Sequence, residues 1–202
     1  MNFLDSRSPW PHTVVEEVFS KNQYLTVVDL SRRLLPAWDY TDSDKLKRMT
    51  CFDVNGRRAN GATNDHDVVV GPLLTSTIEN VFARALRHIG VCPIPEHMMF
   101  QLDVMTPGYI YRMHNDVELK QASMIVYLGE VGRGTVLHDT KPPHRPVVEV
   151  PYRPNTAALF KRFDQSYHSI DQEGITGLRY SLNMVHLLEP LEGGRALDAW
   201  FA

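Results

Sequence analysis

Short β-rich runs, separated by glycine and proline, fill the second half of this chain. Branched and aromatic residues concentrate in strands, whereas Gly and Pro mark the turns that end them. The runs cover residues 98–105, 109–113, 123–128, 135–137, 147–150, 157–160 and 180–188. Strands this short and this closely spaced predict a mainly β fold, a sandwich or barrel, with helices packed outside it.

The helical patterns lie in the first half. Apolar residues recur at helical spacing over residues 77–88, and Gly90 follows as a C-terminal stop. Thr13 before residues 14–19 has the form of a capped helix start. A shorter helix is predicted over residues 29–35.

A segment rich in Asp, Asn and Gly connects these helices. It covers residues 39–72 and predicts long loops with little regular structure. Long loops in compact domains are often lids or binding loops, so residues 51–71 would suit a mobile flap. An ordinary solvated connection is the alternative.

The composition is that of an ordinary globular domain. Of the 202 residues, 43% are apolar and 22% are charged, which excludes disordered and collagen-like chains. The formal charge of -3 offers no general electrostatic footprint for nucleic acid or an anionic membrane. The chain shows no secretory leader and no segment of membrane-spanning length, so we expect a cytoplasmic protein. Cys51 and Cys92 have no CxxC-type partner, which argues against a cysteine-based zinc site or redox pair.

A histidine and an aspartate two positions apart follow one of the predicted strands. Residues i and i+2 of an extended segment point to the same side, so the His114 and Asp116 side chains can converge. His168 follows another predicted strand and can supply a third ligand. Two histidines and one carboxylate form the facial triad of non-haem Fe(II) oxygenases. Short motifs carry a high false-positive risk, so surface polar residues are the alternative for His-x-Asp by itself.

Arg179 begins the last long run, 11 residues after His168. Alternation places Arg179, Ser181 and Asn183 on one face of that strand. A guanidinium that faces the interior needs a fixed anion, and it binds a carboxylate through two parallel hydrogen bonds. A neighbouring hydroxyl can donate a third. The pattern predicts an anchor for a dicarboxylate whose other end chelates the metal.

These motifs together resemble the 2-oxoglutarate- and Fe(II)-dependent oxygenases, and more narrowly their prolyl-hydroxylase-like branch. The similarity runs from about residue 100 to residue 188, nearly half of the chain. Its elements are the Pro-Gly turn, aromatic residue and His-x-Asp of residues 106–116, the strand of residues 124–128, Ser166-Tyr167-His168 and Arg179-Tyr180-Ser181. There are two departures. Met105 stands where many relatives have a Tyr, and Gly132-Arg133-Gly134 replaces a common Gly-Gly pair.

The resemblance implies a double-stranded β-helix, or jelly-roll, core with supporting N-terminal α-helices. The implied Fe(II) ligands are His114, Asp116 and His168, and the implied 2-oxoglutarate contacts are Arg179, Ser181, Tyr127 and Tyr111. The implied reaction consumes O2, decarboxylates 2-oxoglutarate to succinate and CO2, and hydroxylates an unactivated C–H bond. The chain is thus expected to be an oxidoreductase, a dioxygenase with no catalytic residue beyond the metal centre. Desaturation and cyclisation stay open because they use the same iron centre.

We expect one domain, because no internal repeat and no low-complexity linker divides the chain. It comprises a helical and loop-rich N-terminal part over residues 1–97, the jelly-roll catalytic core over residues 98–190 and a C-terminal tail over residues 191–202.

Cationic side chains near the expected mouth of the barrel are candidates for substrate binding. Lys161 and Arg162 lie between a predicted strand and His168, and Arg112 shares strand parity with His114. A solvated loop is the alternative, since exposed Lys and Arg are the rule. We expect a small polar metabolite or an amino acid as substrate, with a peptidyl residue as a further option. No nucleic-acid or membrane partner is expected.

Other classes of function stay open at this point. A cupin-like jelly-roll module can bind a metal or a small anion without catalysis. Cupins usually gather their metal with a His-x-His pair, which this sequence lacks. An interaction scaffold without a ligand is a third option. Arg179 separates these hypotheses, because a simple metal-binding module has no need for a buried dicarboxylate anchor.

Overall fold

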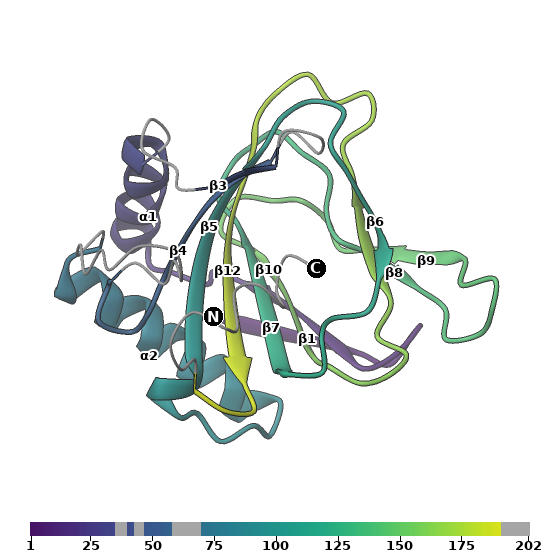
Figure 1. Ribbon diagram of the computed structural model, residues 1–202, viewed down its shortest axis with the longest axis horizontal. Coiled ribbons are helices and arrows are strands. Elements are labelled where there is room, and N and C mark those ends of the chain that lie inside the picture. Colours follow the sequence, from purple (N-terminus) through teal and green to yellow (C-terminus); the bar gives the residue numbers. More distant parts are fainter. Residues whose placement is uncertain (35–39, 43–46, 58–69, 191–202) are drawn as a thin grey trace.

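Two antiparallel β-sheets face each other in this protein, and helices cover the outer side of the larger sheet (Figure 1). The computed structural model describes residues 1–34, 40–42, 47–57 and 70–190. Within these residues, the predicted mainly β fold with a jelly-roll core and supporting N-terminal helices is confirmed.

The larger sheet, called the major sheet here, is antiparallel throughout its described strands. Their spatial order is β1 (Asn2–Ser6), β2 (His12–Glu16), β10 (Ala157–Lys161), β7 (Lys120–Tyr127), β12 (Arg179–Leu187), β5 (Met98–Met105), β4 (Lys47–Phe52) and β3 (Tyr40–Asp42). The long strand β12 lies between β5 and β7, so its side chains have neighbours on both sides.

The smaller sheet, called the minor sheet, has the spatial order β6 (Ile110–His114), β11 (His168–Asp171), β8 (Val136–His138) and β9 (Pro146–Glu149). Its β6–β11 pairing is irregular. His168 lies opposite His114, but Ile170 lies opposite Tyr111. A step of two residues along β11 therefore matches a step of three along β6, which is the pattern of a β-bulge.

The helices in the described residues are α1 (Lys21–Leu34), α2 (Pro72–His88) and the short 3-10 helix η2 (Pro95–His97). The helix predicted over residues 77–88 is confirmed as the main part of α2, and the one predicted over residues 29–35 corresponds to the end of α1. Gly90 follows α2 at φ +68, a conformation that glycine adopts without strain.

The two faces of the major sheet bury different side chains. On β12, Leu182 and Met184 pack in the core beneath the helices. Alternation therefore directs Arg179 and Ser181 to the other face, which is opposite the minor sheet and is called the inner face. The β7 strand follows the same rule, because Tyr127 belongs to a separate cluster on the inner side.

The helix predicted over residues 14–19 is wrong, because this region contributes to β2, which pairs with β1 and β10. The hydroxyl of Thr13 donates to Asp5 Oδ1 at 2.7 Å instead of capping a helix. Val14 and Val15 are β-branched, which suits a strand, and they pack in different clusters on opposite sides of the sheet. Pairing with two neighbouring strands outweighed the local helical pattern.

The N-terminal part over residues 1–97 is not only helical and looped, because it contributes β1 to β4 to the major sheet. Residues 39–72 include β3 and β4, which extend the sheet beyond β5. Most of the predicted flap over residues 51–71 and the tail over residues 191–202 lie outside the described residues. No helix among the described residues is long and apolar enough to cross a membrane.

We expect Phe100→Ala to lower the free energy of unfolding by about 3–5 kcal/mol. The Phe100 ring is fully buried, with its centroid 5.6 Å from that of Phe52 and 6.4 Å from that of Phe82 on α2. Urea denaturation measures the change. Leu73→Ala is the control, because that side chain is 86% exposed and its truncation should cost no more than about 0.5 kcal/mol. Equal effects of the two substitutions would contradict this account of the core.

Candidate active site

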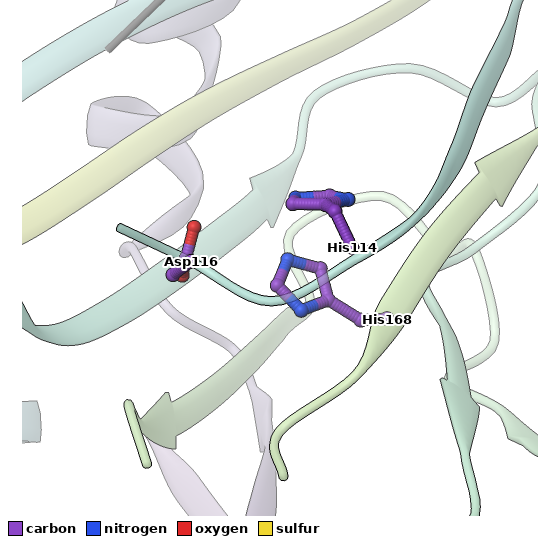
Figure 2. A group of neighbouring side chains, drawn as sticks. All are labelled: His114, Asp116 and His168. Atoms are coloured by element: carbon purple, nitrogen blue, oxygen red, sulfur yellow. The ribbon is translucent and has the colours of Figure 1, made fainter. Parts of the chain in front are cut away.

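Three side chains from two distant segments of the chain converge between the two sheets (Figure 2). His114 ends β6 and His168 begins β11, and the two residues lie directly opposite each other in the ladder. Their ring centroids are 4.3 Å apart. Asp116 follows two residues after His114, and one possible ligand atom from each of the three residues lies within 4.8 Å of the others.

Hydrogen bonds orient both imidazoles. Nδ1 of His114 lies 3.0 Å from the carbonyl oxygen of Arg112, and Nδ1 of His168 lies 2.9 Å from that of Ser166. A carbonyl oxygen only accepts, so Nδ1 of each neutral ring carries the proton. Nε2 of each ring therefore keeps its lone pair, which is the form that binds a metal.

Asn115 connects the two segments that carry the histidines. Its Nδ2 donates to the carbonyl oxygen of Phe163 at 2.9 Å, and its Oδ1 accepts from the hydroxyl of Ser166 at 2.7 Å. Ser166 is also the residue whose carbonyl orients His168. Asn115 was not predicted as a site residue. As the middle residue of His-x-Asp, it points away from the flanking pair, and it can therefore bond the segment before His168.

The carboxylate of Asp116 is buried and has two protein donors. Lys120 Nζ donates to Oδ1 at 2.5 Å, and the hydroxyl of Ser123 on β7 donates to Oδ2 at 2.9 Å. Burial by itself raises the pKa of Asp116, but the charge of Lys120 and the neighbouring His168 outweigh it and hold the pKa below its usual range. The group is therefore an anion at neutral pH.

Both histidines are neutral at neutral pH. Burial, and then the neighbouring His168, lower the pKa of His114 to about 3. Burial lowers the pKa of His168 as well, although Asp116 opposes the shift. Neutral imidazoles beside a carboxylate anion give the donor set N, N, O⁻ that suits a divalent transition metal.

A second feature is the guanidinium of Arg179, which is fully buried on the inner face of β12. Its Nε donates to the carbonyl oxygen of Arg133 at 3.0 Å. Its Nη1 donates to the Ser181 hydroxyl at 3.1 Å and to the sulfur of Met105 at 3.3 Å. Its Nη2 is buried and has no partner. Among these contacts no carboxylate neutralises the charge, so the guanidinium retains the capacity to bind an anion.

Aromatic rings flank this guanidinium. Its central carbon lies 5.5 Å from the ring centroid of Tyr127 and 5.4 Å from that of Tyr152. The Tyr127 hydroxyl donates to Thr135 Oγ1 and accepts from the Thr135 backbone N–H, both at 3.0 Å. Burial raises the pKa of Tyr127, so its hydroxyl stays protonated. Tyr127 was predicted from the sequence as a site residue. Tyr152 and Thr135 were not, because they lie outside the strand that carries Tyr127 and no motif linked them to the site.

The remaining predicted contact, Tyr111, lies beside the metal-ligand cluster. Its ring centroid is 4.1 Å from that of His114. The bulge in β6 brings Tyr111 to this position, because the extra residue shifts the alternation between Tyr111 and His114. Arg112 was predicted to lie on the same face of the strand as His114. Because of the bulge, its side chain is exposed instead, and only its backbone carbonyl contacts His114.

The side chains of Lys161 and Arg162, at the end of β10, point in different directions. Arg162 Nε donates to the backbone carbonyl of Asp116 at 3.3 Å, and its side chain is 19% exposed and pairs with Asp164. Lys161 lies on the helix side, where its Nζ donates to the carbonyl oxygen of Gly90 at 3.3 Å. The placement of Lys161 at the site is therefore wrong. β10 continues through residue 161, and alternation sends Phe160 toward His168 and Lys161 away from it.

The structure is similar to those of 2-oxoglutarate-dependent oxygenases. A prolyl-4-hydroxylase from Pseudomonas putida matches at a TM-score of 0.61 and 10% identity, over 88% of this chain and 92% of that chain. A prolyl hydroxylase from Trichoplax adhaerens, in complex with a peptide of hypoxia-inducible factor, matches at a TM-score of 0.62 and 12% identity, over 93% of this chain and 86% of that chain.

 The α-ketoglutarate-dependent carbocyclase SnoK from nogalamycin biosynthesis matches at a TM-score of 0.62 and 12% identity, over 93% of this chain and 85% of that chain.

These likenesses confirm the predicted resemblance at the level of the fold. No family model and no curated protein matches the sequence. The fold is thus that of the 2-oxoglutarate- and Fe(II)-dependent oxygenases, including the prolyl-hydroxylase-like structures among them.

We expect the metal-free protein to lose stability between pH 7 and pH 5. The pKa values of His114 and His168 are lower in the folded state than the ordinary value of 6.5. Below pH 6.5 the unfolded chain therefore binds more protons, and stability falls as the pH falls toward the folded-state values. His114 contributes a loss of roughly 2 kcal/mol over this range, and His168 adds to it in the same direction. The lowered pKa of Asp116 acts only at lower pH.

Urea denaturation in the presence of a chelator measures this loss at the two pH values. In His114→Gln, the difference between pH 7 and pH 5 should shrink by roughly 2 kcal/mol, because one of the two titrating groups is gone. A pH dependence that is the same in the variant and the wild type would show that His114 does not titrate in this way.

Proposed function

We propose that this protein is an Fe(II)- and 2-oxoglutarate-dependent oxygenase that hydroxylates an unactivated C–H bond of a small polar metabolite or an amino acid. The observation that carries the proposal is a buried guanidinium with an unpartnered Nη2, on the wall opposite a cluster of two histidines and one aspartate. An anion anchor combined with a divalent-metal donor set is what a chelating dicarboxylate cosubstrate requires.

The donor chemistry of the cluster fits Fe(II). His114, Asp116 and His168 would hold the metal through two neutral imidazoles and one carboxylate. Three protein ligands leave coordination positions open for a cosubstrate and oxygen. The hydrogen bonds from Nδ1 of both histidines fix the rings, and Ser123 and Lys120 fix the carboxylate.

The surroundings of Arg179 fit the distal carboxylate of 2-oxoglutarate. Nη2 is an orphaned donor in the interior, and a buried donor without a partner is costly. Ser181 lies beside the guanidinium and can add a hydroxyl contact. Tyr127 and Tyr152 flank the charge with aromatic surface, which excludes water and strengthens the attraction for an anion.

Fe(II) and 2-oxoglutarate, when bound, would supply hydroxylation of a C–H bond by O2, coupled to decarboxylation of 2-oxoglutarate to succinate and CO2. The chain itself binds and orients. Arg179 would hold the distal carboxylate, and the histidines and Asp116 would hold the metal. Tyr127 and Tyr152 flank the guanidinium and would shield it from solvent.

The substrate class is part of the same proposal. Neighbours of similar fold include an enzyme bound to a peptide and a carbocyclase from a small-molecule pathway, so the fold accommodates both kinds of substrate. Arg162 lies against Asp116 with part of its side chain exposed, which supports binding of a substrate carboxylate near the metal. A peptidyl residue is the second candidate.

Arg179→Met is expected to weaken 2-oxoglutarate binding by about 10- to 100-fold, because it removes the charge-assisted hydrogen bonds to the distal carboxylate. Anaerobic titration with Fe(II) and 2-oxoglutarate, followed by the visible charge-transfer band, measures the affinity. Arg133→Met is the matched control. Its side chain is 44% exposed and pairs with Glu149, so its loss should change the affinity by less than about fivefold.

Metal binding provides the second readout of this experiment. Arg179→Met should bind Mn(II) as the wild type does, whereas Asp116→Ala should lose most of the binding because it removes a ligand. A wild-type protein that binds metal but is indifferent to 2-oxoglutarate would refute the oxygenase proposal and favour a metal-binding jelly-roll module.

Arg162→Gln is expected to raise the KM of an acidic small-molecule substrate by about tenfold, because it removes a charge-assisted contact. Lys161→Gln is the control, since this side chain lies on the other face of the sheet. Substrate-dependent succinate formation over a panel of small polar acids and peptides measures both. Turnover of peptides without any small polar acid would refute this substrate class.

A further inference from the structure

An acceptor without a partner lies on the inner face of the major sheet. Oδ1 of Asn183 on β12 is buried and has no hydrogen-bond partner. Leaving a buried acceptor unpaired costs roughly 1–3 kcal/mol, so such atoms are uncommon in folded proteins.

The neighbouring carboxylate decides how the Asn183 amide is oriented. Asn183 Nδ2 donates to Asp103 Oδ2 at 2.5 Å, and Gln101 Nε2 donates to Asp103 Oδ1 at 2.6 Å. A carboxylate only accepts, so the nitrogen of each amide must face it. Exchanging the oxygen and nitrogen of Asn183 would place two acceptors against each other. The unpaired atom is therefore the oxygen.

The two amides on Asp103 differ in what their oxygens meet. Gln101 Oε1 accepts from the thiol of Cys51 on β4, with the sulfur 3.7 Å away. Asn183 Oδ1 has no such donor. The pair thus contains one amide that is satisfied by the protein and one that is available to a ligand.

Asn183 lies on the wall between the two parts of the candidate active site. Alternation along β12 puts it on the same face as Arg179 and Ser181. Two residues further along this face, Val185 lies opposite Ser123, which donates to the Asp116 carboxylate. A ligand group bound at Asn183 would therefore lie between the anion anchor and the metal ligands.

Neither proposed cofactor can satisfy this oxygen. At neutral pH 2-oxoglutarate offers only acceptors, which suit Arg179 Nη2 but not a carbonyl oxygen. The metal would be held by the histidines and Asp116. On the inner face of β12, the orphaned atoms of Arg179 and Asn183 are of opposite kinds, one a donor and one an acceptor, so they call for different ligands.

We propose that Asn183 Oδ1 accepts a hydrogen bond from a free amino group of the primary substrate. This inference rests on the proposed function and narrows its substrate class to amino-bearing small molecules such as amino acids. A protonated amine donates a charge-assisted hydrogen bond, which is stronger than the bond from a neutral hydroxyl, so the amide oxygen favours an amino group.

The first test compares free amino acids with their permethylated betaines in the wild-type enzyme loaded with Fe(II) and 2-oxoglutarate. A betaine keeps the positive nitrogen and the carboxylate but has no N–H to donate. Succinate formation above the basal rate is measured for the twenty protein amino acids and for the betaine of each active one. At least one amino acid should stimulate turnover, and its betaine should be at least about tenfold less effective.

The second test uses Asn183→Leu with Gln101→Met as the matched control. Both substitutions remove one amide donor from Asp103, but only the first removes the unpaired oxygen. The KM of the active amino acid should rise about 10- to 100-fold in Asn183→Leu and clearly less in Gln101→Met. The comparison of amino acid and betaine needs no variant, so it decides the question even if Asn183→Leu does not fold.

The possible failures are distinguishable. If the wild-type protein forms no charge-transfer band with Fe(II) and 2-oxoglutarate, the proposed oxygenase function is refuted. With the band intact, the inference about Asn183 is overturned if no amino acid stimulates turnover, if betaines are as effective as amino acids, or if the two variants raise the KM equally.

Discussion

The pairing of β6 with β11 is the constraint on which the candidate active site depends. Adjacent strands lie about 4.8 Å apart, so the ladder that sets His168 opposite His114 brings the two imidazoles together without any further device. Each ring then bonds the carbonyl oxygen two residues before it, which orients both in the same manner. Asp116 follows directly after β6 and is held by Ser123 of the major sheet, so the cluster also joins the two sheets.

The inner face of β12 supplies the opposite wall. Because β12 is central in the major sheet, its inward side chains are shielded by strands on both sides, and a guanidinium there is removed from water. Burying an isolated charge is unfavourable unless an anion compensates it. The protein provides carbonyl, hydroxyl and thioether acceptors for Arg179 and leaves Nη2 without one. This incomplete satisfaction is the physical basis of the proposed preference for an anionic ligand.

Prediction from the sequence succeeded where one strand contains the whole pattern. Alternation alone placed Arg179 and Ser181 on one face of the last strand, and the structure agrees. The same reasoning failed for Arg112, because a bulge interrupts the alternation of β6. It failed for Lys161 because β10 extends one residue beyond the predicted strand and directs this side chain to the helices. Tyr152 and Thr135 reach the site from other segments and had no local pattern to identify them.

The sequence by itself determined the type of most elements and the chemistry available to them. The period of apolar residues specified α2 and the strands from residue 98 onward except β11, because it reflects which side of an element is buried. Only the tertiary structure decided that residues 12–16 form a strand, that His168 pairs with His114, and that Asp103 turns the oxygen of Asn183 away from itself. Strand partners and register depend on backbone hydrogen bonds and burial between distant segments, and no local pattern contains that information.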